Sequence, residues 1–228
     1  MLRSIILFAS ALGLSSVILA QPDQERKLDP FRKIVVGDRI IARLVKSDHE
    51  SAQVRVQGIE PDAVRTRVSD GTLDLSVYGE PFTRKKVMVT VYFISLNSIS
   101  ANNGAEVSTG SLFKADTLYV DLKSGGMLYL DADIGCLISK IIEGGLLQAE
   151  GYATVQESTV ASTGTLSAYD LESDRITIKV ITGGKAKINV EEELDAEANS
   201  KGYISYKGAP AKLNRTTNSG GSIVVYEP

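Results

Sequence analysis

The sequence has few of the side chains on which most catalytic and metal sites depend. Its 228 residues include one histidine, one cysteine and no tryptophan. The single cysteine, Cys136, excludes a disulfide within the chain and a thiolate zinc site, and we interpret it as a packing residue, with pairing between chains as the alternative. A nucleophile that needs a histidine base would have to use His49, which lies in the polar run 46–50, a predicted exposed turn.

The chain also has no excess of positive charge, with 25 lysines and arginines against 28 aspartates and glutamates. The formal net charge is −3, and it becomes −4 if Arg3 is removed with the first twenty residues. This balance argues against nucleic acid as a partner. The sequence contains no P-loop and no dinucleotide-binding fingerprint between a strand and a helix, and it implies no cofactor.

Residues 1–20 carry one early charge, Arg3, and two apolar runs that end at the small residue Ala20. This pattern predicts a secretory signal peptide, cleaved before Gln21, and an exported protein with no membrane span after cleavage. The alternative is a membrane anchor, for which the apolar stretch is short and interrupted. Residues 21–30 are charged and contain two prolines, so they are predicted to form a flexible leader.

The region 118–225 repeats about every nineteen residues around a two-residue marker. The markers are Gly125-Gly126, Gly144-Gly145, Thr163-Gly164, Gly183-Gly184, Lys201-Gly202 and Gly220-Gly221. Three residues after each marker lie Leu128, Leu147, Leu166, Ala186, Ile204 and Ile223, and five after lie Leu130, Ala149, Ala168, Ile188, Tyr206 and Val225. Polar or mixed residues separate them, and this alternation predicts a strand with one buried face.

A second strand precedes each marker, because the positions seven before it are also mostly apolar: Leu118, Leu137, Gln156, Ile176, Leu194 and Leu213. Three before it lie Leu122, Ile141, Val160, Val180, Ala198 and Thr217. A strand–turn–strand unit cannot bury its apolar face alone, so equal offsets are expected to stack in columns roughly 4.8 Å apart. The sequence therefore predicts an all-β parallel β-helix with about two strands and 19 residues per coil.

The domain is predicted to cover residues 31–228. Residues 31–98 form an amino-terminal β cap with antiparallel hairpins, and residues 99–228 form the repeat solenoid. Asp70-Gly71 separates two alternating segments, which is typical of a two-residue β-hairpin. A cap is physically required because an open end exposes the apolar columns and unpaired strand edges.

Acidic residues form two clusters in the sequence: Asp131, Asp133 and Glu150, and, at every second position, Asp170, Glu172 and Asp174. Several carboxylates are what calcium requires, so these are candidate calcium ligands. Glu150 is expected to stack on Asp131, because both lie six residues after a marker. The alternative is a solvated acidic face, since stacked carboxylates repel one another.

Three tyrosines, Tyr129, Tyr169 and Tyr226, fall at offsets predicted to face outward. Exposed aromatic rings are the usual stacking platforms for carbohydrate, so these are candidate ligand-binding residues. The alternative is that they shield strand edges or pack against one another.

The order of several motifs resembles a known family. The motifs are Val35-Val36-Gly37-Asp38, residues 44–48, Asp70-Gly71-Thr72-Leu73, residues 99–105 and the recurring Gly-Gly turns. From about Phe31 onward the chain is similar to the head GIN domain, the putative auto-transporter adhesin family of Bacteroidetes envelopes. The resemblance implies a β-helix related in shape to pectin lyases, no recognised catalytic set, and a proposed role in adhesion. At three turns, Thr163, Lys201 and Asn103 replace glycine.

Three functions remain open from the sequence. The first is a non-catalytic β-helix, secreted or in the periplasm or at the surface of a Gram-negative cell, that binds glycan or protein. The second is a structural envelope protein that forms homo-oligomers. The third is a calcium-assisted polysaccharide lyase or hydrolase that uses the acidic clusters.

Overall fold

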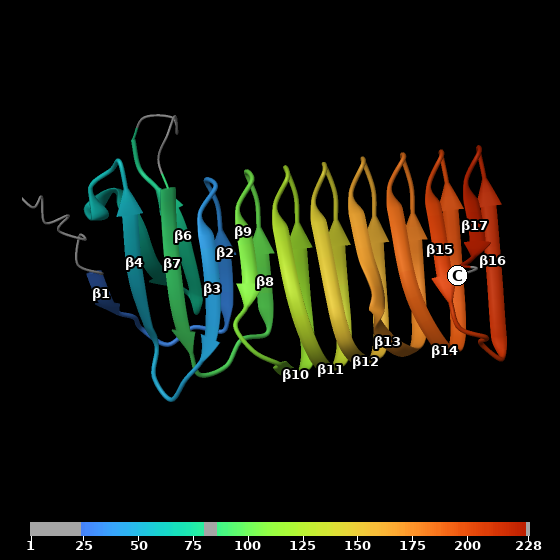
Figure 1. Ribbon diagram of the computed structural model, residues 1–228, viewed down its shortest axis with the longest axis horizontal. Coiled ribbons are helices and arrows are strands. Elements are labelled where there is room, and N and C mark those ends of the chain that lie inside the picture. The colour runs from blue at the N-terminus through green and yellow to red at the C-terminus, as the bar shows by residue number, and fades with distance from the viewer. Residues whose placement is uncertain (1–23, 80–85, 227–228) are drawn as a thin grey trace, which may run out of the picture.

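The computed structural model describes residues 24–79 and 86–226, which form a two-sided stack of strands (Figure 1). The amino-terminal strands are β1 (Gln24–Lys27), β2 (Lys33–Val36), β3 (Ile41–Lys46), β4 (Ser51–Gln57), β5 (Val64–Ser69), β6 (Thr72–Val77), β7 (Lys86–Phe93), β8 (Ser98–Ala101) and β9 (Glu106–Thr109). The remaining strands are β10 (Phe113–Leu122), β11 (Met127–Ile141), β12 (Leu146–Val160), β13 (Thr165–Val180), β14 (Lys185–Asn199), β15 (Tyr203–Lys207), β16 (Lys212–Asn218) and β17 (Ser222–Val225).

The predicted all-β solenoid is confirmed. In the described residues the one helix is a single 3-10 turn, η1 (Pro61–Ala63). The signal peptide predicted for residues 1–20 lies outside the described residues, as do residues 21–23 of the predicted leader.

Each coil runs down one side of the stack and returns along the other. In β11, Met127 pairs with Glu106 just after a turn, and Ile141 pairs with Leu122 just before the next turn. Both ends of this strand therefore lie at the edge that carries the turns, and its middle bends at the opposite, lower edge (Figure 1). The first halves of β11–β14 continue into β15 and β17 as one sheet, the front sheet. The second halves continue into β16 as the back sheet.

The predicted columns are present in the strand register. Leu128 pairs with Leu147, and the same column continues through Leu166, Ala186, Ile204 and Ile223. In the back sheet the column that begins at Leu118 runs through Leu137, Gln156, Ile176, Leu194 and Leu213. Gln156 is the polar exception, and it is fully buried with its amide donating to Ser158 Oγ at 3.1 Å.

The two marker residues of each turn have different roles. Ser124 and Gly125 both have positive φ, 49° and 74°, and the Gly126 N–H donates to the Lys123 carbonyl at 2.9 Å, which is a type I′ turn. The second marker needs glycine for space, because a Cβ at Gly126 would lie 2.1 Å from the carbonyl oxygen of Ala101 in the preceding coil. Thr163 and Lys201, with φ of 66° and 65°, occupy only the first position.

The assignment of Asn103 to a glycine position was wrong. Glu106 pairs with Met127, so Asn103 is aligned with Ser124, and Gly104 with Gly125. Asn103 and Gly104 form the same left-handed pair, with φ of 50° and 72°. The residue that stands in place of glycine is Ala105, at the second marker position.

The predicted boundary between cap and solenoid also needs correction. Strands β2 and β3 already run parallel to β8 and β9 in the stack. Strands β6 and β7 come later in the chain than β2 and β3. They pair in parallel with β2 and β3 on the side that faces away from β8 and β9. Coil stacking thus begins within residues 31–98. In the described residues the antiparallel pairs are β1–β4, β4–β7 and β5–β6. The predicted hairpin at Asp70-Gly71 is confirmed, because Ser69 pairs with Thr72.

The flexible leader predicted for residues 21–30 is contradicted from residue 24 onward. Strand β1 pairs antiparallel with β4, and Leu28, directly after it, is buried. The guanidinium of Arg26 donates to the carbonyl oxygen of Pro61 at 2.8 Å and also to that of Val64, across the end of the stack. Charge and proline content suggested a leader, but unpaired backbone groups of the edge strand β4 provide partners for this segment.

Candidate binding surface

Two of the three candidate tyrosines meet on the front sheet, near the last coils. Their ring centroids lie 4.8 Å apart with the planes tilted by 53°. The meeting follows from an irregularity in β13, whose pairing with β14 skips from Ala168 to Glu172. Tyr169 lies in this bulge, reaches across β14 and donates its hydroxyl to Ser205 Oγ on β15 at 2.6 Å. Tyr226 follows directly after β17 and is 40 % exposed.

Two lysines complete this surface. Lys207 Nζ lies 4.8 Å from the ring centroid of Tyr169 and 5.3 Å from that of Tyr226, and Lys187 Nζ lies 5.6 Å from Tyr169. These are cation–π distances. Tyr203, 39 % exposed, starts the next strand in the same sheet. We call the set Tyr169, Lys187, Tyr203, Ser205, Lys207 and Tyr226 the tyrosine–lysine face.

The three candidate tyrosines differ in exposure and in surroundings, and ligand binding by them stays a prediction. Tyr226 is exposed, whereas Tyr169 is half-buried and packs against it, which was the alternative interpretation. Tyr129 lies elsewhere on the sheet, beside Gln148 and at the edge of a hollow of about 150 Å³ that also contacts Asp131. Sequence reasoning missed Lys187, Tyr203 and Lys207, although their outward offsets in the repeat could have identified them.

The six candidate acidic residues do not form one site. Asp131, Glu150 and Asp170 are neighbours in register, as was predicted for Asp131 and Glu150. Asp133 instead forms an ion pair with Lys114 at 2.6 Å. Glu172 is exposed in line with Tyr152, and Asp174 accepts a hydrogen bond from the Tyr152 hydroxyl at 2.7 Å, which raises the pKa of that phenol.

In the described part of the chain, no three or more histidine, cysteine, aspartate or glutamate side chains are close enough to hold a metal ion. The stacked carboxylates Asp131, Glu150 and Asp170 therefore match the solvated acidic face more closely than a calcium cage, which needs oxygen ligands that converge on one point.

A groove of about 740 Å³ lies along the lower edge, where the amino-terminal strands meet the first regular coils. Its lining is mainly polar and includes Arg32, Asn97, Lys114, Thr117, Tyr152 and Thr154. The lining also includes Asp133, which the sequence analysis named as a candidate calcium ligand. The groove is open, and the aromatic residues in its lining are Tyr152, which is exposed, and Phe93, which is buried.

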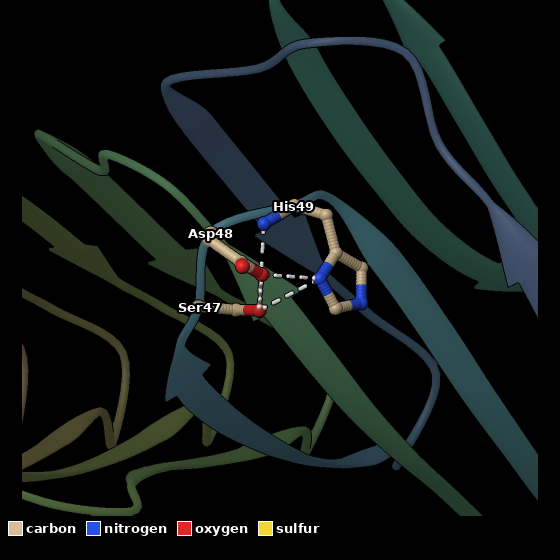
Figure 2. A network of polar contacts seen from close by, with 3 residues as sticks. All are labelled: Ser47, Asp48 and His49. Carbon is tan, nitrogen blue, oxygen red and sulfur yellow. Dashed lines mark hydrogen bonds and ion pairs between the residues drawn. The ribbon is translucent and has the colours of Figure 1, made fainter.

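The lone histidine lies in an exposed turn, as predicted. Its Nδ1 contacts both Asp48 Oδ1 at 2.7 Å and Ser47 Oγ at 3.1 Å (Figure 2). In a catalytic triad, one ring nitrogen of the histidine contacts the carboxylate and the other contacts the nucleophile. Here the same nitrogen contacts both Asp48 and Ser47, so the three residues are not arranged as a triad. The side chains of His49 and Asp48 are 61 % and 97 % exposed, and the hydrogen bond from His49 lowers the pKa of Asp48.

Cys136 is half-buried rather than fully packed. Burial raises the pKa of its thiol, which disfavours the reactive thiolate at neutral pH.

Parallel coils of nineteen residues joined by type I′ turns define a β-solenoid. The chain belongs to the family described as "Putative auto-transporter adhesin, head GIN domain", whose model matches residues 30–210. No curated protein matches this sequence.

Several solved structures share the fold. A protein from Bacteroides fragilis described as a putative adhesin is 22% identical, with a TM-score of 0.80. One from Parabacteroides distasonis described as a putative lipid binding protein is 16% identical, with a TM-score of 0.73. A putative adhesin from Parabacteroides merdae is 18% identical, with a TM-score of 0.70. Each match covers 90% of this chain and 96% of the other. In the described residues, helices long and apolar enough for a membrane span are absent.

Proposed function

We propose that this protein is a non-catalytic, exported binding protein, located in the periplasm or at the surface of a Gram-negative cell. It binds glycan chains through the tyrosine–lysine face. The observation that carries the proposal is the convergence of Tyr169, Lys207 and Tyr226, from three successive parts of the front sheet, on one outer surface. The family description and the two solved adhesin-like relatives support a role in adhesion.

The chemistry of the face suits sugars. Tyrosine combines an apolar ring, on which a pyranose can stack, with a hydroxyl that forms hydrogen bonds. The ring of Tyr169 is fixed by its bond to Ser205, which is only 4 % exposed, so little side-chain entropy is lost on binding.

The arrangement of acidic residues gives less support to calcium-assisted cleavage. Asp133 and Asp174 are engaged by Lys114 and Tyr152, away from the column of Asp131, Glu150 and Asp170. A lyase or hydrolase needs its acid, base and metal around one scissile bond.

Tyr226→Ala is expected to weaken glycan binding about fivefold to tenfold, because one aromatic stacking contact contributes about 1 kcal/mol. The measurement is equilibrium binding of residues 21–228 to immobilised polysaccharides, first as a screen and then by titration. Tyr119→Ala is the matched control, since Tyr119 is 50 % exposed on β10 in the back sheet. Equal losses in both variants, or none in either, would contradict the assignment of the face.

A second candidate function, self-association, is favoured by the last coil. Within residues 24–79 and 86–226, β16 pairs with β14 and β17 pairs with β15, and no strand pairs with their outer edges. Column residues that are buried in every earlier coil are exposed here, with Leu213 at 39 % and Val225 at 49 %. The other end is covered, and Val64 there is 1 % exposed. A second copy related by a two-fold axis would present an equivalent edge for antiparallel pairing.

Leu213→Lys is expected to shift such a dimer towards monomer, because it places a charge in the shared apolar column. The measurement is sedimentation equilibrium of the mature protein between about 1 µM and about 1 mM, a range that detects weak association. Lys140→Gln, on the exposed surface of β11, is the control. A monomer at every concentration would exclude this second function and leave glycan binding untouched.

A further inference from the structure

The outer surface of the front sheet is free of acidic residues over the last three coils. Residues 185–190, 203–207 and 222–226 contain no aspartate or glutamate, yet they contribute Lys185, Lys187 and Lys207. The chain as a whole carries a net charge of −3. The tyrosine–lysine face is therefore a cationic region on an acidic protein.

The back sheet of the same coils shows the opposite arrangement. There Lys179 pairs with Glu197 at 3.0 Å, Lys212 with Glu193 at 3.4 Å, and Arg175 with Glu192 at 3.8 Å. Within the described part of the chain, neither Lys187 nor Lys207 has a carboxylate oxygen within 4.0 Å. Neither lysine that neighbours the tyrosines therefore has its charge offset by an ion pair of this kind.

Two ammonium groups held against one ring repel each other. Both Lys187 and Lys207 lie over Tyr169, at 5.6 and 4.8 Å, and the ring quadrupole offsets only part of that repulsion. An anionic group that binds beside Tyr169 would reduce the repulsion between these two positive charges. The site is therefore suited to an anion that arrives attached to something which also stacks on tyrosine.

We infer that the ligand of this face is an anionic polysaccharide, in which a carboxylate or sulfate group binds Lys187 and Lys207 while its sugar ring stacks on Tyr226. The inference rests on the proposed function and specifies its ligand class. A free inorganic anion would leave the aromatic rings unused. A nucleic acid would use both features, but the acidic remainder of the protein disfavours a polymer with so dense a negative charge.

The test is equilibrium binding of residues 21–228 to polygalacturonate, dextran sulfate and uncharged dextran, with and without added salt. We expect saturable binding to at least one charged polymer, none to dextran, and weakening as salt screens the exposed charges. The two charged polymers distinguish a carboxylate from a sulfate ligand. Circular dichroism checks that the protein stays folded at high salt. If it stays folded and binding is lost, the binding has an electrostatic contribution.

The double variant Lys187→Gln/Lys207→Gln is expected to weaken binding at least about tenfold, given two charge-assisted contacts. Lys123→Gln/Lys140→Gln makes the same change in net charge at exposed positions away from the face and is expected to bind normally. Lys187→Arg/Lys207→Arg keeps both charges and is expected to retain binding. Equal losses in the two glutamine doubles would mean that net charge alone acts, which overturns the site.

The remaining outcomes separate this inference from the proposed function. Binding to dextran that is lost in Tyr226→Ala but not in the glutamine double would retain glycan binding and overturn the anionic ligand. Tighter binding to a single-stranded oligonucleotide than to either charged polysaccharide would also overturn it. Binding to no polysaccharide in the screen would contradict both proposals.

Discussion

Leu147→Asp is expected to unfold the protein at 25 °C. Leu147 is fully buried in the column between Leu128 and Leu166, so a carboxylate there would lose its hydration without gaining a partner. We expect a loss of at least about 4 kcal/mol, a large share of the typical total of about 5–15 kcal/mol. Far-ultraviolet circular dichroism and chemical denaturation of residues 21–228 would measure it.

The adjacent residue provides the control. Gln148 lies one position along β12 and is exposed on the outer surface of the front sheet. Gln148→Asp introduces the same side chain and is expected to change the free energy of unfolding by about 0.5 kcal/mol or less. Similar tolerance at both positions would contradict the inward and outward alternation on which the fold is based.

Gly126→Ala is expected to cost about 3 kcal/mol, although alanine is a small substitution. The new Cβ would lie 2.1 Å from the Ala101 carbonyl oxygen, and that oxygen belongs to the backbone of the neighbouring coil. The coils would have to separate locally and weaken the strand pairing on both sides of the turn. The midpoint of urea denaturation measures the effect.

Gly125→Ala, one residue earlier, tests the same turn without the clash. Its φ is +74°, and the nearest atoms to a new Cβ lie 3.9 Å away, so the cost is backbone strain alone, about 1–2 kcal/mol. Thr163 and Lys201 already occupy the equivalent position in other coils. A larger loss at Gly125 than at Gly126 would show that φ, rather than close approach of the coils, determines the need for glycine.

The regular coils could be predicted from the sequence because each buried column repeats at a fixed offset. One such column contains the apolar residues Leu118, Leu137 and Ile176. A shift of the strand register by one residue would turn every side chain to the opposite surface, so only this register keeps the apolar residues in one column. The hairpin at Asp70-Gly71 could also be predicted, because two-residue hairpin turns favour an Asp-Gly pair.

Two features could not be read from the sequence. The order of the amino-terminal coils depends on long-range pairing, in which β6 and β7 stack outside β2 and β3 although they follow them in the chain. The tyrosine–lysine face depends on a bulge in β13 that carries Tyr169 across β14 to Ser205. Neither pairing has a local signal, because the partners are determined by three-dimensional packing rather than by neighbouring residues.

The most direct test of glycan binding at the tyrosine–lysine face is a nuclear magnetic resonance titration of isotope-labelled residues 21–228 with a short oligogalacturonate. We expect amide shift changes centred on Lys187, Lys207 and Tyr226, with the oligosaccharide recovered at its original length. Shift changes centred on the lower groove around Tyr152 would contradict the location of the site. Shortening of the oligosaccharide would contradict a non-catalytic function.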